Sequence, residues 1–181
     1  DGPQPTEEHQ KERLKTYFDP LPFYYPPLEQ QRTDATEYPF FAVTQRPMFM
    51  YHSWDSQNAW LRQIMSQNYL YMHRSKGEAL GIKDFGWAWV ESHNGKIRVQ
   101  VKLMEGVNPE TVWTWNAIGK KQGSWGLSDD ANESQKGFLM NHLINELLPG
   151  EAEADGHRMT NSDPITGQAA WYDLRVKITP V

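Results

Sequence analysis

The side chains best suited to binding a ligand lie between Thr44 and Leu61, where a predicted strand leads into a predicted helix. Hydrogen-bonding residues crowd this segment: Thr44, Gln45, Arg46, Tyr51, His52, Ser53 and Asn58. An arginine fork, hydroxyl groups and the free amides of a helix start together suit a polyanionic, nitrogen-rich ligand. Taken singly, each residue also fits an ordinary structural role, such as a helix cap for Ser53 or a packed core histidine for His52.

Familiar catalytic and metal-binding patterns are missing from the sequence. The six histidines form no HExxH or HxH pattern, and the lack of cysteine removes thiolate zinc sites, iron–sulfur ligation and cysteine nucleophiles. Gly119–Gly126 lacks the strand–GxxxxGK[ST]–helix context of a phosphate loop, and Asp129–Asp130 is typical of a solvated turn. We therefore predict no catalytic residue and no metal ligand, and we expect the chain to be inactive by itself.

The elements that position the Thr44–Leu61 segment are predicted to be mainly strands. Alternation of apolar and polar residues, as at Ile97, Val99 and Val101, indicates strands with one buried face. The predicted strands are 37–46, 69–72, 86–91, 96–104, 111–116 and 170–179, and the predicted helices are 54–66, 75–80 and 135–148. Asn94-Gly95 predicts a hairpin, and Gly81 a helix stop. Short strands, few helices and no βαβ rhythm favour one closed β-barrel with helical insertions.

The first 36 residues differ in composition from the rest. Six of the 12 prolines lie before residue 28, and aromatic residues alternate with them from Leu14 to Pro27. Because proline fixes φ and removes a donor, this composition predicts an extended strap or linker over 1–36 that lies on another surface, followed by a domain over 37–181.

Charge and hydropathy exclude several functional classes. Eighteen basic against 23 acidic residues give a net charge of −5, which argues against nucleic-acid binding, and the mean hydropathy is −0.76. Apolar runs such as Phe40–Val43 are far shorter than the roughly 20 residues of a membrane span, so we expect a soluble protein with no membrane insertion. Asp1–Pro3 does not resemble a signal peptide but the cut end of a longer chain. The compartment, a bacterial-type cytoplasm or periplasm, stays open.

Four motifs, in order along residues 37–181, resemble the C-terminal domain of molybdopterin oxidoreductases of the dimethyl-sulfoxide-reductase family. They are the T-x-R…H-S…N pattern of Thr44–Asn58, Ala79–Gly86, Asn141–Ile144 and Asn161–Tyr172. The sequence departs from the family's D-G-D at Asp84-Phe85-Gly86. Tyr51–Trp54 and Ala59–Gln63 are most similar to the branch that acts on inorganic sulfur compounds.

The resemblance implies a mainly β fold, a six-stranded double-psi β-barrel of the aspartate-decarboxylase-like type with short helical insertions. It also implies molybdopterin guanine dinucleotide as cofactor, with molybdenum ligated by other domains of the full enzyme. The implied partners are those remaining domains and an iron–sulfur electron-transfer subunit.

The resemblance further assigns roles to individual residues. Thr44 and Arg46 would reach the pterin or its phosphates, His52 and Ser53 would donate hydrogen bonds beside them, and Asn58 would stiffen the loop. In a second loop, Asn161–Gln168, Asn161 and Gln168 would contact a pterin edge, and Asn141 would orient that loop, which would converge with Thr44–Ser53 on one cleft. Asn161 also fits an Asx turn before Asp163-Pro164, and Asn141 fits a solvent-facing helix position.

An alternative from another class is a stand-alone β-barrel binding module. The chain contains 8 Trp and 8 Tyr, which favours interfaces because both side chains keep one polar edge. A carbohydrate platform would need coplanar exposed rings on one sheet face, with Trp113 and Trp115 or Trp87 and Trp89 as the candidates. A cofactor cap would instead need the two polar loops to meet.

Overall fold

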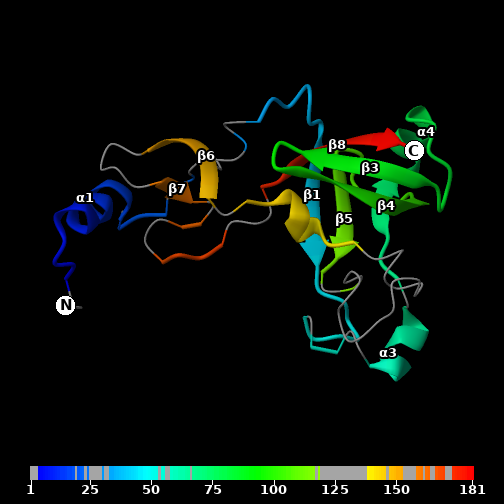
Figure 1. Ribbon diagram of the computed structural model, residues 1–181, viewed down its shortest axis with the longest axis horizontal. Coiled ribbons are helices and arrows are strands. Elements are labelled where there is room, and N and C mark those ends of the chain that lie inside the picture. The colour runs from blue at the N-terminus through cyan, green and yellow to red at the C-terminus, as the bar shows by residue number, and fades with distance from the viewer. Residues whose placement is uncertain are drawn as a thin grey trace.

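The strands form a closed barrel of six strands. The computed structural model describes residues 4–18, 20–22, 24, 30, 33–52, 54–55, 58–65, 67–116, 118, 138–145, 147–152, 158–160, 162–163, 166–169 and 173–181. The barrel strands are β1 (Phe40–Gln45), β2 (Leu70–His73), β3 (Trp87–Ser92), β4 (Gly95–Met104), β5 (Thr111–Trp115) and β8 (Arg175–Pro180). They follow one another around the barrel in the order β1-β5-β2-β4-β3-β8 (Figure 1), which confirms the predicted fold class.

Two parallel pairs are built into this otherwise antiparallel barrel. β1 runs parallel to β5, from Phe41 opposite Thr111 to Gln45 opposite Trp115, and β2 runs parallel to β4. Pairs of this kind require long connections that cross the barrel, as the double-psi topology does. Because β1 and β5 are parallel, both strands end on the same side of the barrel.

Alternating burial explains why these segments close on themselves. In β4 the side chains of Ile97, Val99, Val101 and Leu103 are buried, and the residues between them are half-buried or exposed. Val90, Val112 and Val176 meet them inside from three other strands. Each buried aliphatic side chain contributes roughly 1.5–3 kcal/mol, so the barrel interior is the main source of stability.

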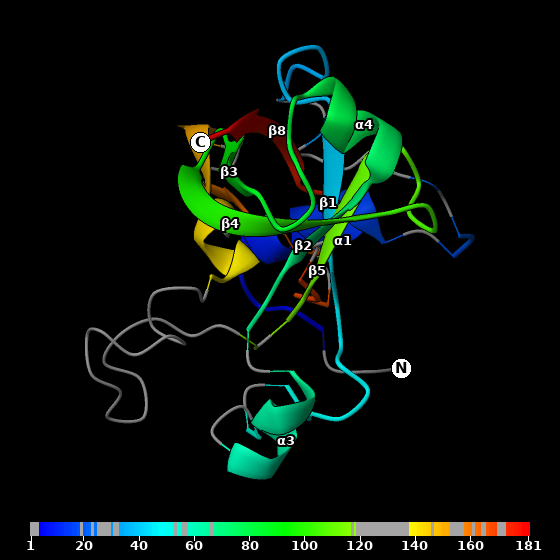
Figure 2. The same ribbon diagram turned by 90° about the vertical axis from the view of Figure 1, so that its right-hand side faces the viewer.

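Two short helices mark opposite ends of the barrel. α4 (Arg74–Ala79) follows β2 directly and stops at Gly81, whose φ of +75° suits glycine, as the sequence predicts. α3 (Ala59–Ile64) begins only at Ala59, later than the predicted start at residue 54, because Asn58 caps it. Figures 1 and 2 place α3 below the barrel and α4 above it.

The predicted helix over 135–148 is wrong. Its described part forms a single 3-10 turn, η2 (Met140–Leu143), and the strand β6 (Leu147–Ala152), which pairs with β7 (Arg158–Thr160). The Leu143 carbonyl accepts hydrogen bonds from Ser92 Oγ at 2.7 Å and Asn94 Nδ2 at 3.2 Å, so the barrel hairpin takes the acceptor that a continuing helix would use.

The N-terminal segment is not extended throughout. Glu8–Tyr17 forms α1, a helix with no buried residue, in which Glu8 pairs with Lys11 and Glu12 with Lys15. These local pairs favour a helix in the proline-free stretch between Pro5 and Pro20. In Figure 1, α1 lies beside β6 and β7, away from the barrel. The division into 1–36 and 37–181 stays a prediction.

The last barrel strand is also shorter than predicted. It begins at Arg175, while Ala170–Tyr172 lie outside the described residues. Within the described part of the chain, no helix is long and apolar enough to cross a membrane.

Candidate functional site

The candidate site begins where the parallel strands β1 and β5 end. The Asn116 backbone N–H donates to the Gln45 carbonyl at 2.7 Å and so extends the pairing one residue beyond β5. Thr44 lies opposite Thr114 and is buried, whereas Gln45 and Arg46 are exposed. The Thr114 hydroxyl donates to the Tyr69 carbonyl, just before β2 starts. Three strands therefore bring their polar ends to one end of the barrel.

The segment after β1 folds into a tight turn below this end. The Tyr51 backbone N–H donates to Asp55 Oδ2 at 3.0 Å, and the Trp54 N–H donates to the Tyr51 carbonyl at 3.0 Å. His52 has a φ of +48°, and its ring meets the Tyr51 ring edge to face at 4.8 Å. A positive φ at a residue other than glycine is held by the surrounding structure and is common at functional sites.

Asn58 fixes the start of α3. Its Oδ1 accepts from the backbone N–H groups of Trp60 and Leu61, at 3.0 and 3.4 Å, and its own N–H donates to the Asp55 carbonyl at 2.9 Å. Its amide oxygen is therefore used by the helix itself. Asn58 therefore positions the loop before α3, and other residues of the loop are better placed to contact a ligand.

The second predicted loop does not join this segment. Asn141 is exposed on η2, which packs on the β3–β4 hairpin. Gln168 is exposed in a turn where its carbonyl accepts from the Asp163 N–H at 2.7 Å. Residues 166–169 run beside β6 and β7 in Figure 1, apart from the segment that follows β1. The β6–β7 hairpin carries this stretch away from the barrel, so the described residues show no convergence. Ser53 and Asn161 lie outside the described residues.

Sequence reasoning missed two asparagines at the end of the barrel. Asn68 is almost fully buried; its Nδ2 donates to the carbonyls of Trp115 at 2.9 Å and Ile118 at 3.2 Å, and its Oδ1 accepts from the Tyr69 N–H. Asn116 lies in the chain between Trp115 and Ile118, whose carbonyls both accept hydrogen bonds from Asn68. The parallel pairing that brings Asn116 beside Gln45 spans some seventy residues and has no local sequence signal.

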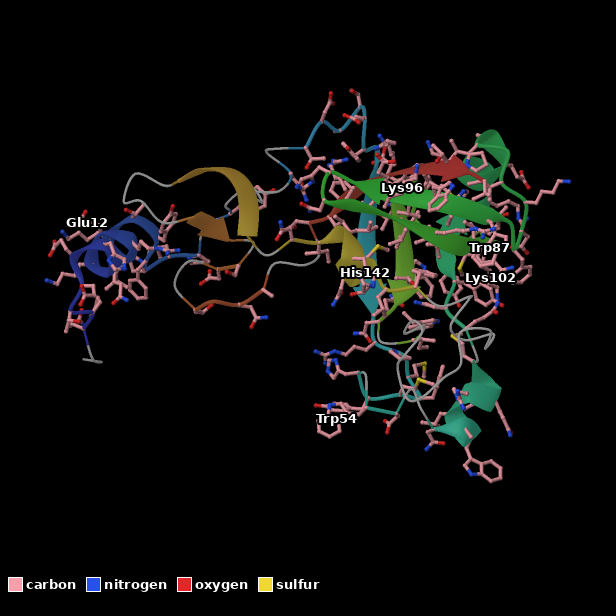
Figure 3. All side chains as sticks on the ribbon, viewed as in Figure 1. Glu12, Trp54, Trp87, Lys96, Lys102 and His142 are labelled. Atoms are coloured by element: carbon pink, nitrogen blue, oxygen red, sulfur yellow. The ribbon has the colours of Figure 1, made fainter. Side chains whose placement is uncertain are left out.

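The aromatic residues on the outside of the barrel cover one another. Tyr71 stacks on Trp113 at 3.9 Å between ring centroids, and Trp113 meets Trp115 edge to face at 84°. On another face, Arg98 lies over Trp87 and Lys96 over Trp89. Trp113 and Trp115 are therefore not coplanar, and Trp87 and Trp89 are half-buried beneath cationic side chains. The exposed Trp54 lies far from Trp87 (Figure 3). The tryptophans that the structure describes therefore give no support to the carbohydrate-platform alternative.

The chemistry that the described residues offer at the end of β1 is hydrogen bonding and the positive charge of Arg46. Arg46 is exposed, and no described carboxylate forms an ion pair with it. No group of three or more His, Asp or Glu side chains that could hold a metal occurs among the described residues. The site can therefore bind a polar, anionic ligand through Arg46, hydroxyls and amides.

Comparison with known proteins agrees with this chemistry. Residues 40–153 match the family described as the molydopterin dinucleotide binding domain. The chain is 58% identical over 177 residues to a sulfite dehydrogenase subunit of Allochromatium vinosum, covering 98% of this chain and 18% of that protein. It is 30% identical over 138 residues to acetylene hydratase of Syntrophotalea acetylenica, covering 74% of this chain and 18% of that protein.

A solved structure shares the fold. The acetylene hydratase from Pelobacter acetylenicus superposes with a TM-score of 0.64 at 20% identity, over 92% of this chain and 22% of that one. The chain thus spans less than a fifth of the length of the curated relatives. The family match extends from β1 through β6 and includes both strand ends of the candidate site. The chain belongs to the molydopterin dinucleotide binding domain family.

Proposed function

We propose that this chain caps a bis(molybdopterin guanine dinucleotide) cofactor in the catalytic subunit of a molybdenum oxidoreductase, and that the end of the β1–β5 pair is the contact surface. The observation that carries the proposal is the placement of Thr44, Arg46 and Asn116 at one end of a barrel whose family binds molybdopterin dinucleotides. When bound, molybdenum held by the pterin dithiolenes supplies two-electron or oxygen-atom transfer.

The residues at this end fit such a ligand. Pterin and guanine rings present donor and acceptor edges, which amides match in both senses, and the pyrophosphate is anionic. Arg46 is exposed beside the buried Thr44 hydroxyl and the Gln45 amide, so it can pair with phosphate oxygens. Asn116 Oδ1 is buried and has no hydrogen-bond partner among the described residues, as expected of a group that meets a ligand.

Each predicted side chain then has a defined task. Arg46 would hold the pyrophosphate, Thr44 and Gln45 would donate to the heterocycle or phosphates, and Tyr51 and His52 would close over them. Asn58 would hold this loop through its cap on α3. Ser53, Asn141, Asn161 and Gln168 remain proposed contacts, and those of Asn141 and Gln168 need the rest of the enzyme to bring their segments closer.

The missing domains would cover the same end of the barrel. Large apolar side chains are exposed along the segment after β1 and on α3: Met48, Tyr51, Trp54, Trp60 and Ile64. Exposed patches of this kind mark interfaces. On the outside of β3 and β8, by contrast, Lys177 bridges Glu37 and Glu91 at 3.1 Å each. This contrast supports an enzyme in which α3 faces the remaining domains.

The reaction we propose is oxidation or reduction of an inorganic sulfur compound. The support is the 58% identity with a sulfite dehydrogenase over nearly the whole chain. An iron–sulfur subunit is the proposed electron-transfer partner. This chain contributes cofactor binding, and the catalytic residues and molybdenum ligand lie elsewhere in the enzyme.

Arg46→Ala in the full enzyme tests the proposal. Loss of a charge-assisted contact weakens binding by about 1.5–3 kcal/mol, so the molybdenum and guanine nucleotide bound per enzyme should both fall. Lys76→Ala removes one exposed positive charge from α4, at the other end of the barrel, and should leave both contents unchanged. Equal cofactor content in the two variants would contradict the proposed contact surface.

A further inference from the structure

We propose that the side-chain oxygen of Asn116 accepts a hydrogen bond from an N–H group of the cofactor's pterin or guanine ring. This inference rests on the proposed function and adds a contact residue that no sequence motif indicates. It follows from the hydrogen bonds that the described backbone groups around Asn116 make and from the lack of one at its side-chain oxygen.

The backbone of Asn116 is fully engaged. Its N–H donates to the Gln45 carbonyl at 2.7 Å, and its carbonyl accepts from the Ile118 N–H at 2.9 Å. The flanking carbonyls of Trp115 and Ile118 both accept from the Asn68 side chain. The chain on either side of Asn116 is thus held by four hydrogen bonds, which fix the position of its backbone.

The side chain itself is left incomplete. Asn116 Oδ1 is buried without a hydrogen-bond partner among the described residues, whereas the neighbouring amide of Asn68 uses its oxygen and its nitrogen. Burying an amide oxygen without a donor is unfavourable, and native proteins keep few such groups. An oxygen in this state gains a hydrogen bond when a donor group of a ligand reaches it.

The chemistry of an acceptor selects the part of the cofactor. Phosphate oxygens are themselves acceptors and cannot satisfy Asn116, whereas the amino and amide groups of a pterin or guanine ring donate. Arg46, one residue beyond the Gln45 carbonyl to which Asn116 is bonded, suits the pyrophosphate. Arg46 would therefore bind the pyrophosphate of the cofactor, and Asn116 would accept a hydrogen bond from one of its rings.

The experiment compares Asn116→Leu with wild type in the full enzyme. Each is prepared in two forms, one loaded with cofactor and one free of cofactor, the latter from cells that cannot make molybdopterin. Thermal unfolding is measured for both forms, and release of guanine nucleotide from the loaded form is followed with time. Asn108→Leu is the matched control, because Asn108 precedes β5, at the far end of the barrel, and its oxygen serves a local turn.

We expect Asn116→Leu to leave the unfolding temperature of the cofactor-free enzyme unchanged or raised, because an unpaired oxygen is removed. In the loaded enzyme it should reduce the stabilisation by cofactor and speed nucleotide loss by roughly two- to tenfold, the effect of one hydrogen bond between uncharged groups. Asn108→Leu should change neither the stabilisation by cofactor nor the rate of nucleotide loss.

Two outcomes overturn the inference. An equal loss of stability in the loaded and cofactor-free forms would show that Asn116 is structural. Unchanged nucleotide release would show that a water or another protein group satisfies the oxygen. Arg46→Ala in the same assay separates the two proposals: if Arg46→Ala weakens cofactor retention and Asn116→Leu does not, only this inference fails, and if neither does, the proposed contact surface fails.

Discussion

Replacement of Asn68 by alanine should loosen the end of the barrel that forms the candidate site. Asn68 is 1% exposed and makes hydrogen bonds to the Trp115 carbonyl, the Ile118 carbonyl and the Tyr69 N–H, at 2.9, 3.2 and 3.0 Å. Each contributes about 0.5–1.5 kcal/mol net, so the variant should lose roughly 2–4 kcal/mol of unfolding free energy.

Urea unfolding of the 181-residue chain measures this loss. If the unfolding free energy falls by about 2 kcal/mol per molar urea, the urea concentration at the midpoint of unfolding should fall by about 1–2 M. Asn108→Ala removes one hydrogen bond from an exposed turn, to the Glu110 N–H, and should cost less than about 1 kcal/mol. Equal midpoints for the two variants would refute the argument that Asn68 ties β5 to the start of β2.

Two further predictions concern other parts of the chain. Burial raises the pKa of the Asp173 carboxyl above its ordinary value of 3.8; the folded state therefore binds its proton more tightly, and stability falls as pH rises from 3.8 through the folded pKa. Asp173→Asn should remove that loss, and a wild-type-like pH profile of unfolding in the variant would contradict it. Amide hydrogens of α1 should exchange fast, because this helix buries no residue, and protection equal to that of β4 would show that α1 is anchored.

The barrel could be predicted from the sequence because its signals are local. Alternation at Ile97, Val99 and Val101 defined β4, Asn94-Gly95 defined the hairpin, and Gly81 ended α4. The segment from Thr44 to His52 could be singled out as a candidate site for the same reason, since its donors lie close together in the chain, and its role in binding stays a prediction.

The features that sequence reasoning missed depend on contacts between distant residues. The Leu143 carbonyl is taken by Ser92 and Asn94, some fifty residues away, so a helical pattern there yields a 3-10 turn and a strand. Asn116 gains its place only from the parallel pairing of β1 with β5. No periodicity in a single sequence reports either contact.

The most direct test of the proposed function is an experimental structure of the cofactor-loaded enzyme that contains this chain. The proposal predicts a molybdopterin guanine dinucleotide at the ends of β1 and β5, with its pyrophosphate within hydrogen-bond distance of Arg46 and a ring nitrogen within reach of Asn116. A cofactor seated at the α4 end of the barrel, or one that touches neither residue, would contradict it.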